Sequence, residues 1–215
     1  AAEGLVRVAM EGNTAAIVEV NSETDFVAKN QEFIDLVNDI AKVIVANKPA
    51  TMEEALACEL NGKTVEATVV DATAKIGEKL SFRRMEVITK KDSENFGDYI
   101  HMGGKVGVLI EIEGCTCEKA HELAHDLALQ IAAAKPLYLD ESEVPAEIVE
   151  HEKEILLAQI ENDEKLKSKP EMVKENMVKG KIQKYFDENC LLRQAFIKDP
   201  AQKISAVVKA SGDSM

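Results

Sequence analysis

The stretch Ala16-Ile17-Val18-Glu19-Val20, followed by residues 33–49, decides the fold because the chain contains this pattern twice. The second copy is Val108-Leu109-Ile110-Glu111-Ile112, followed by residues 120–136. Both copies end on a Lys-Pro pair, and aligning these pairs gives seven identities in seventeen positions. Chance gives about one at average residue frequencies. The chain therefore contains an internal duplication of a strand followed by a helix.

The matched positions are those that a helix needs in order to pack on a sheet. Leu36 aligns with Leu123, and Ile44 aligns with Ile131. Spacings of three and four residues put these side chains on one stripe of each helix, and the proline then ends the helix. We therefore expect an α+β fold of two repeated subdomains, each a small antiparallel sheet packed with helices.

The rest of the chain predicts a boundary and a helical arm. Residues 80–88 alternate as a strand does, and polar residues 90–95 follow, so we expect one subdomain over residues 1–92 and another over 93–215. Two helical patterns joined by polar residues 165–170 predict a protruding αα-hairpin at about 144–190, inserted in the second subdomain. The apolar positions expected along its seam are Ile148, Ile155, Leu156 and Ile160, then Met172, Val173, Met177, Ile182 and Phe186.

Such a hairpin buries a single seam, so it is either a docking arm or a dimer element. Beyond it, the pair Asp199-Pro200 is expected to open a last helix that carries Ile204.

The two copies differ in the loop between strand and helix. Twelve residues separate Val20 from Phe33, whereas seven separate Ile112 from Ala120, so the first copy carries an extension. An extended loop on a duplicated scaffold is a natural place for function. Phe26 is a large apolar residue in this mostly polar loop. Residue types alone leave two interpretations of it, a hydrophobic staple against the following helix or an exposed binding residue.

Composition restricts the class of partner. The 215 residues include 39 Asp and Glu against 26 Lys and Arg, giving a formal net charge of −13. This balance argues against nucleic acid as a direct partner, since phosphates are held by basic side chains. No apolar run approaches the roughly 18 residues of a membrane span. We expect a cytoplasmic protein with a protein or small-molecule partner and no membrane association.

Two further motifs carry possible chemistry. His121-Glu122-Leu123-Ala124-His125 fits the H-E-x-x-H zinc-protease pattern, in which two imidazoles hold zinc and the glutamate acts as the base. A zinc-dependent hydrolase is therefore an alternative function, although both histidines adjoin a packing stripe. Cys115 and Cys117 give a weak metal or redox signal, and we expect all four cysteines to be reduced.

The loop Glu19 to Asn30, with its Thr24-Asp25-Phe26-Val27 core, resembles the signature of the elongation factor Ts family. Ile76-Gly77-Glu78 with Arg83-Arg84, residues 106–109, and residues 130–136 resemble further family segments in the family order. The hairpin, with Lys169-Pro170 and residues 177–181, fits as well. The resemblance covers nearly the whole chain.

The resemblance implies a function and a site. Members are guanine nucleotide exchange factors for the translational GTPase elongation factor Tu, and they act by protein contact rather than as enzymes, without a cofactor or metal. The residues implied for exchange and partner binding are Thr24, Asp25, Phe26 and Val27, whose loop enters the GTPase near its magnesium and phosphate site. A second partner contact is implied at Gln130, Ile131, Ala132 and Ala133.

Other implications concern assembly and extent. The hairpin serves relatives in docking or in homodimer formation, and a non-catalytic dimeric scaffold is a further alternative function. Family members usually begin with a ubiquitin-associated-like domain and continue past the position of Met215. We therefore expect this chain to be a core fragment that lacks both segments.

Overall fold

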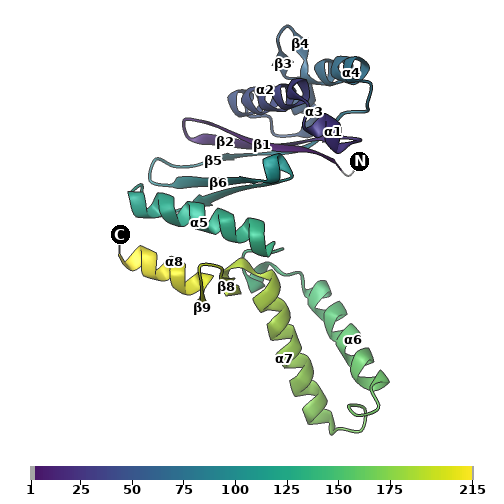
Figure 1. Ribbon diagram of the computed structural model, residues 1–215. Coiled ribbons are helices and arrows are strands. Elements are labelled where there is room, and N and C mark those ends of the chain that lie inside the picture. Colours follow the sequence, from purple (N-terminus) through teal and green to yellow (C-terminus); the bar gives the residue numbers. More distant parts are fainter. Residues whose placement is uncertain (1–2, 215) are drawn as a thin grey trace. The chain divides into compact units, whose positions relative to one another are not determined.

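The computed structural model describes residues 3–214 (Figure 1). The chain consists of two compact units, one extending to Ala132 and the other Ala133–Ser214. Helices combine with small antiparallel sheets of two or three strands, so the predicted α+β class is confirmed. Both copies of the repeated strand lie in the first unit, and the predicted division into residues 1–92 and 93–215 stays a prediction.

The first repeat forms a three-stranded antiparallel sheet in the order β1 (Glu3–Glu11), β2 (Thr14–Ser22) and β5 (Ser81–Thr89). Helix α2 (Gln31–Asn47) packs on β1 and β2 (Figure 1). It ends at Lys48, which adopts a left-handed conformation directly before Pro49. The predicted stripe of this helix is confirmed, since its fully or nearly fully buried side chains are Phe33, Leu36, Val37, Ile40, Ala41, Ile44 and Val45.

A compact excursion leads from α2 back to the sheet. It consists of α3 (Met52–Ala57), the short strands β3 (Glu59–Leu60) and β4 (Lys63–Thr64), and α4 (Val65–Ile76). Residues 77–80 then enter β5, so this excursion brings the segment after α4 close to the end of β2.

The second repeat forms a two-stranded sheet of β6 (Asn95–His101) and β7 (Val106–Ile112), joined by the 3₁₀ turn η1 (Met102–Gly104). Helix α5 (Glu118–Ala134) packs on it through Ala128 and Ala132, which contact Val108. A Cβ added to Gly97 in β6 would lie 2.6 Å from a carbonyl oxygen of α5, so only glycine permits this close approach.

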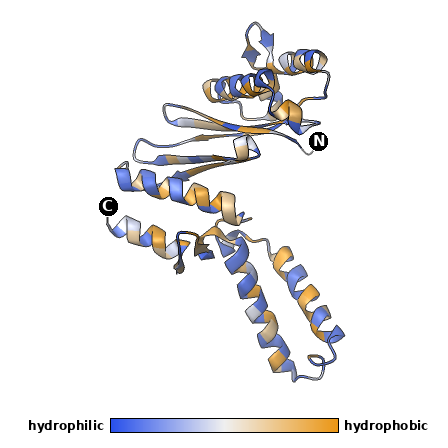
Figure 2. Cartoon of the chain, viewed as in Figure 1, coloured by the Kyte–Doolittle hydropathy of each residue, from blue (hydrophilic) through white to orange (hydrophobic). Residues whose placement is uncertain are grey.

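The predicted αα-hairpin is present as α6 (Ala146–Asn162) and α7 (Glu171–Asn189) (Figure 1). Figure 2 shows apolar residues interspersed with hydrophilic ones along both helices. The buried seam contains Ile160, Val178 and Ile182, flanked by partly buried Val149, Leu156, Met177 and Phe186.

The predicted seam is wrong at three positions. Ile155, Met172 and Val173 are exposed, with 73% of Met172 accessible. The buried stripe of α7 runs at four-residue spacing through Lys174, Val178 and Ile182, so Met172 and Val173 fall outside it. Lys174 is buried instead, and its ammonium lies 2.6 Å from the Glu161 carboxylate.

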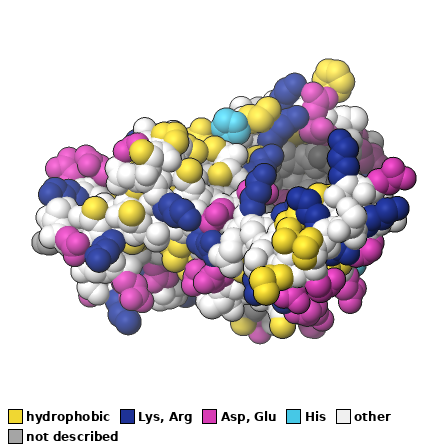
Figure 3. Space-filling view, turned by 90° about the horizontal axis from the view of Figure 1, so that it is seen from below, with side chains coloured by type: hydrophobic (Ala, Val, Ile, Leu, Met, Phe, Trp, Pro, Cys, Tyr) yellow, Lys and Arg dark blue, Asp and Glu magenta, His cyan; other side chains and the backbone are white. Residues whose placement is uncertain are grey.

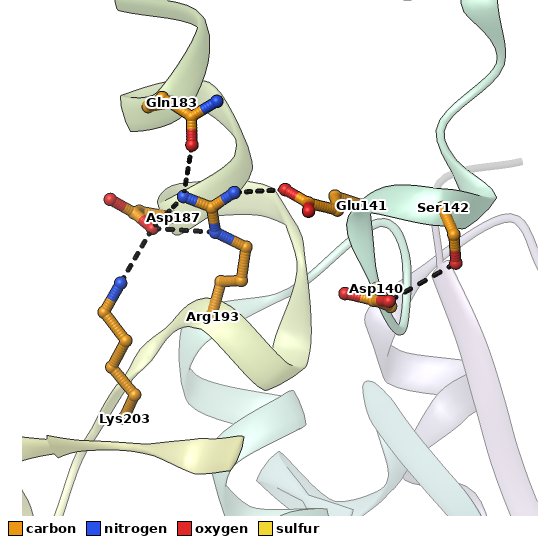
Figure 4. Close-up of polar contacts among 7 residues, drawn as sticks. All are labelled: Asp140, Glu141, Ser142, Gln183, Asp187, Arg193 and Lys203. Atoms are coloured by element: carbon orange, nitrogen blue, oxygen red, sulfur yellow. Dashed lines mark hydrogen bonds and ion pairs between the residues drawn. The ribbon is translucent and has the colours of Figure 1, made fainter. Parts of the chain in front are cut away.

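Arg193, in the 3₁₀ turn η3 (Leu191–Arg193), connects the end of α7 to the turn η2 (Glu141–Glu143) (Figure 4). Its guanidinium donates to Gln183 at 2.8 Å, to Asp187 at 3.0 Å and to Glu141. Burial alone would raise the pKa of Asp187, but hydrogen bonds from Lys203 and Arg193 outweigh it and lower this pKa. These ion pairs fix the base of the hairpin.

The prediction that Asp199-Pro200 opens the last helix is wrong. The pair begins the strand β9 (Asp199–Lys203), which pairs with β8 (Ala195–Phe196), and the helix α8 is Ile204–Asp213. The Asp199 carboxylate accepts from the backbone N–H of Ala201, an Asx-type turn that competes with helix capping. A two-stranded sheet has only edge strands, which tolerate proline.

Acidic side chains are spread over the face seen in Figure 3, with basic and hydrophobic ones between them. Within residues 3–214, no helix has the length and apolar character required to cross a membrane.

Candidate functional site

The extension of the first repeat folds into one extra helical turn, α1 (Asp25–Ala28), between β2 and α2. Thr24 caps this turn, because its hydroxyl accepts from the Val27 backbone N–H at 3.4 Å. Asn30 then caps α2 by accepting from the N–H groups of Glu32 and Phe33. Capping side chains satisfy backbone donors that would otherwise have no partner, so the loop has a defined conformation.

A second segment holds the start of this loop. The Glu78 carboxylate accepts two hydrogen bonds from Thr24, at 3.1 Å from its backbone N–H and at 2.6 Å from its hydroxyl. The Glu23 carboxylate in turn accepts from the backbone N–H of Lys79 at 3.3 Å. The sequence identified Ile76-Gly77-Glu78 only as a segment that resembles the family. It could not predict the contact between Thr24 and Glu78, because these residues lie 54 positions apart.

The side chains of α1 divide between the core and the solvent. Val27 and Ala28 are 8% and 7% exposed and belong to the core that α2 and the sheet form. Phe26, between Asp25 and Val27, is 81% exposed. The staple interpretation of Phe26 is therefore wrong, since a staple side chain lies against its helix. The buried side chains of Val27 and Ala28 anchor the turn, and the ring of Phe26 extends from it into solvent.

Asp25 adjoins Phe26 and is ionised. A hydrogen bond from the Lys29 ammonium, 2.9 Å from the carboxylate, is the main cause that lowers the pKa of Asp25, and the positive charges of Lys29 and Lys105 add to it. The pair is exposed, so water screens it and it adds little to stability. Asp25 therefore presents a carboxylate that a partner can reach.

A cavity of about 300 Å³ lies beside the loop. Its lining includes Leu5, Ile34 and Met102 together with Asp25, Lys29 and Lys105. Met102, at the turn between β6 and β7, is 65% exposed. No sequence pattern indicated this exposed methionine.

The second predicted contact, Gln130 to Ala133, lies near the end of α5. Gln130 and Ala132 are buried, Ile131 is partly buried against the second sheet, and only Ala133 is exposed. Their role in partner binding stays a prediction.

His121 and His125 lie one turn apart on the exposed side of α5, and Glu122 is exposed as well. The ring of His125 contacts Tyr99 edge-on. Among residues 3–214, no group of three His, Cys, Asp or Glu side chains is arranged to hold a metal ion. A zinc site needs at least three protein ligands, so the geometry there does not support the hydrolase alternative.

The expectation of four reduced cysteines is wrong at one pair. Cys115 and Cys117, in the loop between β7 and α5, are joined by a disulfide, whereas Cys58 and Cys190 are free. The spacing carried only a weak signal, because any C-x-C motif is compatible with either state.

The duplicated core and the fixed loop with its exposed aromatic ring are typical of a protein that acts by contact with another protein. Comparison with known families gives the particular class. The family model for elongation factor Ts matches residues 23–215, which is nearly the whole chain. The chain belongs to the elongation factor Ts family, whose members are nucleotide exchange factors of translation elongation.

Proposed function

We propose that this chain binds elongation factor Tu in the cytoplasm and promotes release of GDP by inserting the Asp25-Phe26 loop near the magnesium and phosphate site. The observation that carries the proposal is the 81% exposure of Phe26 on a turn whose other apolar side chains are buried. Family membership supplies the class of reaction.

The required chemistry is a shift of binding equilibrium. If the chain weakens GDP binding by some factor, then GDP weakens binding of the chain by the same factor. The chain must therefore bind the nucleotide-free GTPase more tightly than the GDP-bound form, and this difference in affinity is the driving force of exchange.

Phe26 supplies the apolar part of this difference. A phenylalanine ring buries a large area when it enters a pocket, and a loop whose backbone is already ordered loses less conformational entropy on binding. Two hydrogen bonds from Thr24 to Glu78 and the buried Val27 hold the loop before the partner arrives. Insertion between partner helices would displace them and open the nucleotide site.

Asp25 supplies the polar part. Its carboxylate is ionised at neutral pH, and the hydrogen bond from Lys29 lowers its pKa further. An added negative charge near bound magnesium and phosphate competes with the phosphate oxygens for the cation and for the hydrogen-bond donors of the site. Weaker magnesium contacts then favour departure of GDP without any covalent step.

Two further contacts belong to the proposal. Residues 130–133 would meet a second part of the same GTPase, with Ala133 as the exposed member. The hairpin leaves Ile155, Met172 and Val173 exposed, and this apolar surface suits docking or homodimer formation.

Stopped-flow release of a fluorescent GDP analogue from elongation factor Tu tests the proposal. We expect the wild-type chain to accelerate release, and we expect Phe26→Ala and Asp25→Ala to lose most of the acceleration. Val70→Ala is the matched control, because Val70 is 61% exposed but lies in α4, outside the loop.

If the wild-type chain leaves the release rate unchanged, the proposed activity is wrong for this chain. If the wild-type chain accelerates release and both loop variants do so equally well, the exchange function stands but its assignment to the loop is wrong.

A further inference from the structure

The disulfide between Cys115 and Cys117 lies in the loop that joins β7 to α5, on the second repeat and in no part of the proposed exchange loop. The two Cα atoms lie 5.4 Å apart, within the range that disulfides span. Both residues are half-buried, and their neighbours Gly114, Thr116 and Glu118 are exposed. A small reagent can therefore reach the pair from solvent.

Stabilisation of the fold is a weak explanation for this disulfide. A disulfide stabilises a fold mainly by closing a loop in the unfolded chain, and the effect grows with loop length. Here one residue separates the two cysteines, so the closed loop is among the shortest possible. The pair is accordingly better explained by its chemistry than by its effect on stability.

The backbone around the pair favours thiolate chemistry. The Cys117 carbonyl accepts the first hydrogen bonds of α5, from the N–H groups of Ala120 and His121, so Cys117 directly precedes the N-terminus of this helix. The positive end of a helix favours an anion there. The backbone N–H of Cys117 also donates to the sulfur of Cys115 at 3.0 Å.

A further contact fixes the loop. Asn95, which is 2% exposed, donates from its side-chain amide to the carbonyl oxygen of Cys115. This hydrogen bond anchors the loop that carries both cysteines to the start of β6, so the loop has a defined conformation.

The other two cysteines lie in surroundings that disfavour the thiolate. Cys190 is fully buried, and burial is the main cause that raises the pKa of its thiol. Burial also raises the pKa of the Cys58 thiol, and the charge of Glu54 adds to this effect. Neither has a cysteine partner, and both are free thiols. They provide an internal reference for reactivity.

We propose that Cys115 and Cys117 form a reversible thiol–disulfide exchange site, which reacts with low-molecular-weight thiols and disulfides of the glutathione class. In the oxidising direction, one thiolate attacks the small disulfide, forms a mixed disulfide and releases one thiolate. The second cysteine thiolate attacks the mixed disulfide at the protein sulfur and displaces the second thiolate. The two cysteines lose two protons and two electrons, and the small disulfide becomes two thiols.

Thiol trapping of the intact chain in glutathione buffers tests this proposal. The chain is equilibrated at ratios from fully reduced to fully oxidised glutathione, quenched with acid, unfolded in denaturant, alkylated with N-ethylmaleimide and mapped by mass spectrometry. We expect the peptide with Cys115 and Cys117 to change reversibly from two alkylated thiols to an unalkylated form lighter by two hydrogens. We expect Cys58 and Cys190 to remain alkylatable thiols in every buffer.

Single variants identify the exchange partner of each sulfur. In Cys115→Ser and in Cys117→Ser the internal link is impossible, so oxidised buffer should leave a mixed disulfide with glutathione on the remaining cysteine. Circular dichroism checks that both variants fold. None of these readouts involves a GTPase, so they do not depend on the proposed exchange function.

Two results overturn the proposal. One is that both residues remain thiols in the most oxidising buffer, or react no more readily than Cys58. The other is that reduced glutathione fails to open the link while a strong dithiol does so, which would make the disulfide a structural one.

Discussion

Replacing Phe26 by alanine is expected to separate partner binding from folding. Its side chain is 81% exposed, so the free chain buries only a small part of it. A phenylalanine side chain presents about 200 Å², of which the fold therefore covers about 40 Å². At about 25 cal/mol per Å², the loss of folding stability is about 1 kcal/mol.

The same substitution acts more strongly on the complex. Burying the remaining area of the ring in a partner pocket is worth up to about 4 kcal/mol. Interface hot spots measured by alanine substitution cost about 2–4 kcal/mol. We therefore expect Phe26→Ala to weaken binding to nucleotide-free elongation factor Tu by roughly 30-fold to several-hundred-fold.

Isothermal titration calorimetry with the nucleotide-free GTPase measures the binding loss, and thermal unfolding of the free variant measures the folding loss. A binding loss below about threefold, with the fold intact, would refute the assignment of Phe26 to the interface. A folding loss of about 3 kcal/mol or more would instead identify Phe26 as a core residue and contradict its exposure.

Three other outcomes follow from the contacts. Glu78→Ala removes both acceptors that hold the start of the exchange loop, so GDP release should slow in the stopped-flow assay, while Glu78→Gln, which keeps one acceptor oxygen, should retain an intermediate rate. Gly97→Ala places a Cβ 2.6 Å from a carbonyl oxygen of α5, so it should lower the free energy of unfolding by about 1–3 kcal/mol, measured by chemical denaturation. Gly180→Ala is the control, because its added Cβ meets nothing within 4 Å, and it should leave stability unchanged or raise it. The pKa of Asp187 is lowered in the folded chain, so the contribution of its carboxylate to folding stability is complete above the ordinary pKa of 3.8 and is lost as the pH falls through the folded pKa. Asp187→Asn should therefore reduce the loss of folding stability measured in acid. The change should not exceed about 1 kcal/mol, because the side chain is 41% exposed.

Periodicity predicted those parts of the fold in which one face of an element is buried. The stripe of α2 follows directly from apolar residues spaced three and four apart, and the duplication extends it to α5. The hairpin was predictable for the same reason, together with its polar connector. Thr24 and Asn30, residue types that favour helix starts, cap α1 and α2.

Pairings between distant segments were not predictable. β1 lacks a strong alternation in the sequence, and it is a strand because β2 supplies its hydrogen-bond partners. Glu78 reaches Thr24 only because α3 and α4 bring the chain back to the sheet. Asp199-Pro200 offered the same local signal as a helix start, and pairing with β8 determined the outcome.

The candidate site divides in the same way. Residue types predicted a functional loop at the extension of the first repeat, but they left the orientation of Phe26 open. Burial of Val27 and Ala28 on the same turn decides it, because a single helical turn cannot direct three consecutive side chains into one core.

The most direct test of nucleotide exchange by this chain is an equilibrium cycle with elongation factor Tu. The affinity of the chain is measured for the nucleotide-free and the GDP-bound GTPase, and the affinity of GDP is measured with and without saturating chain. We expect the chain to bind the nucleotide-free form more tightly and to weaken GDP binding by the same factor, with the factor greatly reduced in Phe26→Ala. Equal affinity of the wild-type chain for the two forms, with GDP binding unchanged, would contradict the proposed function.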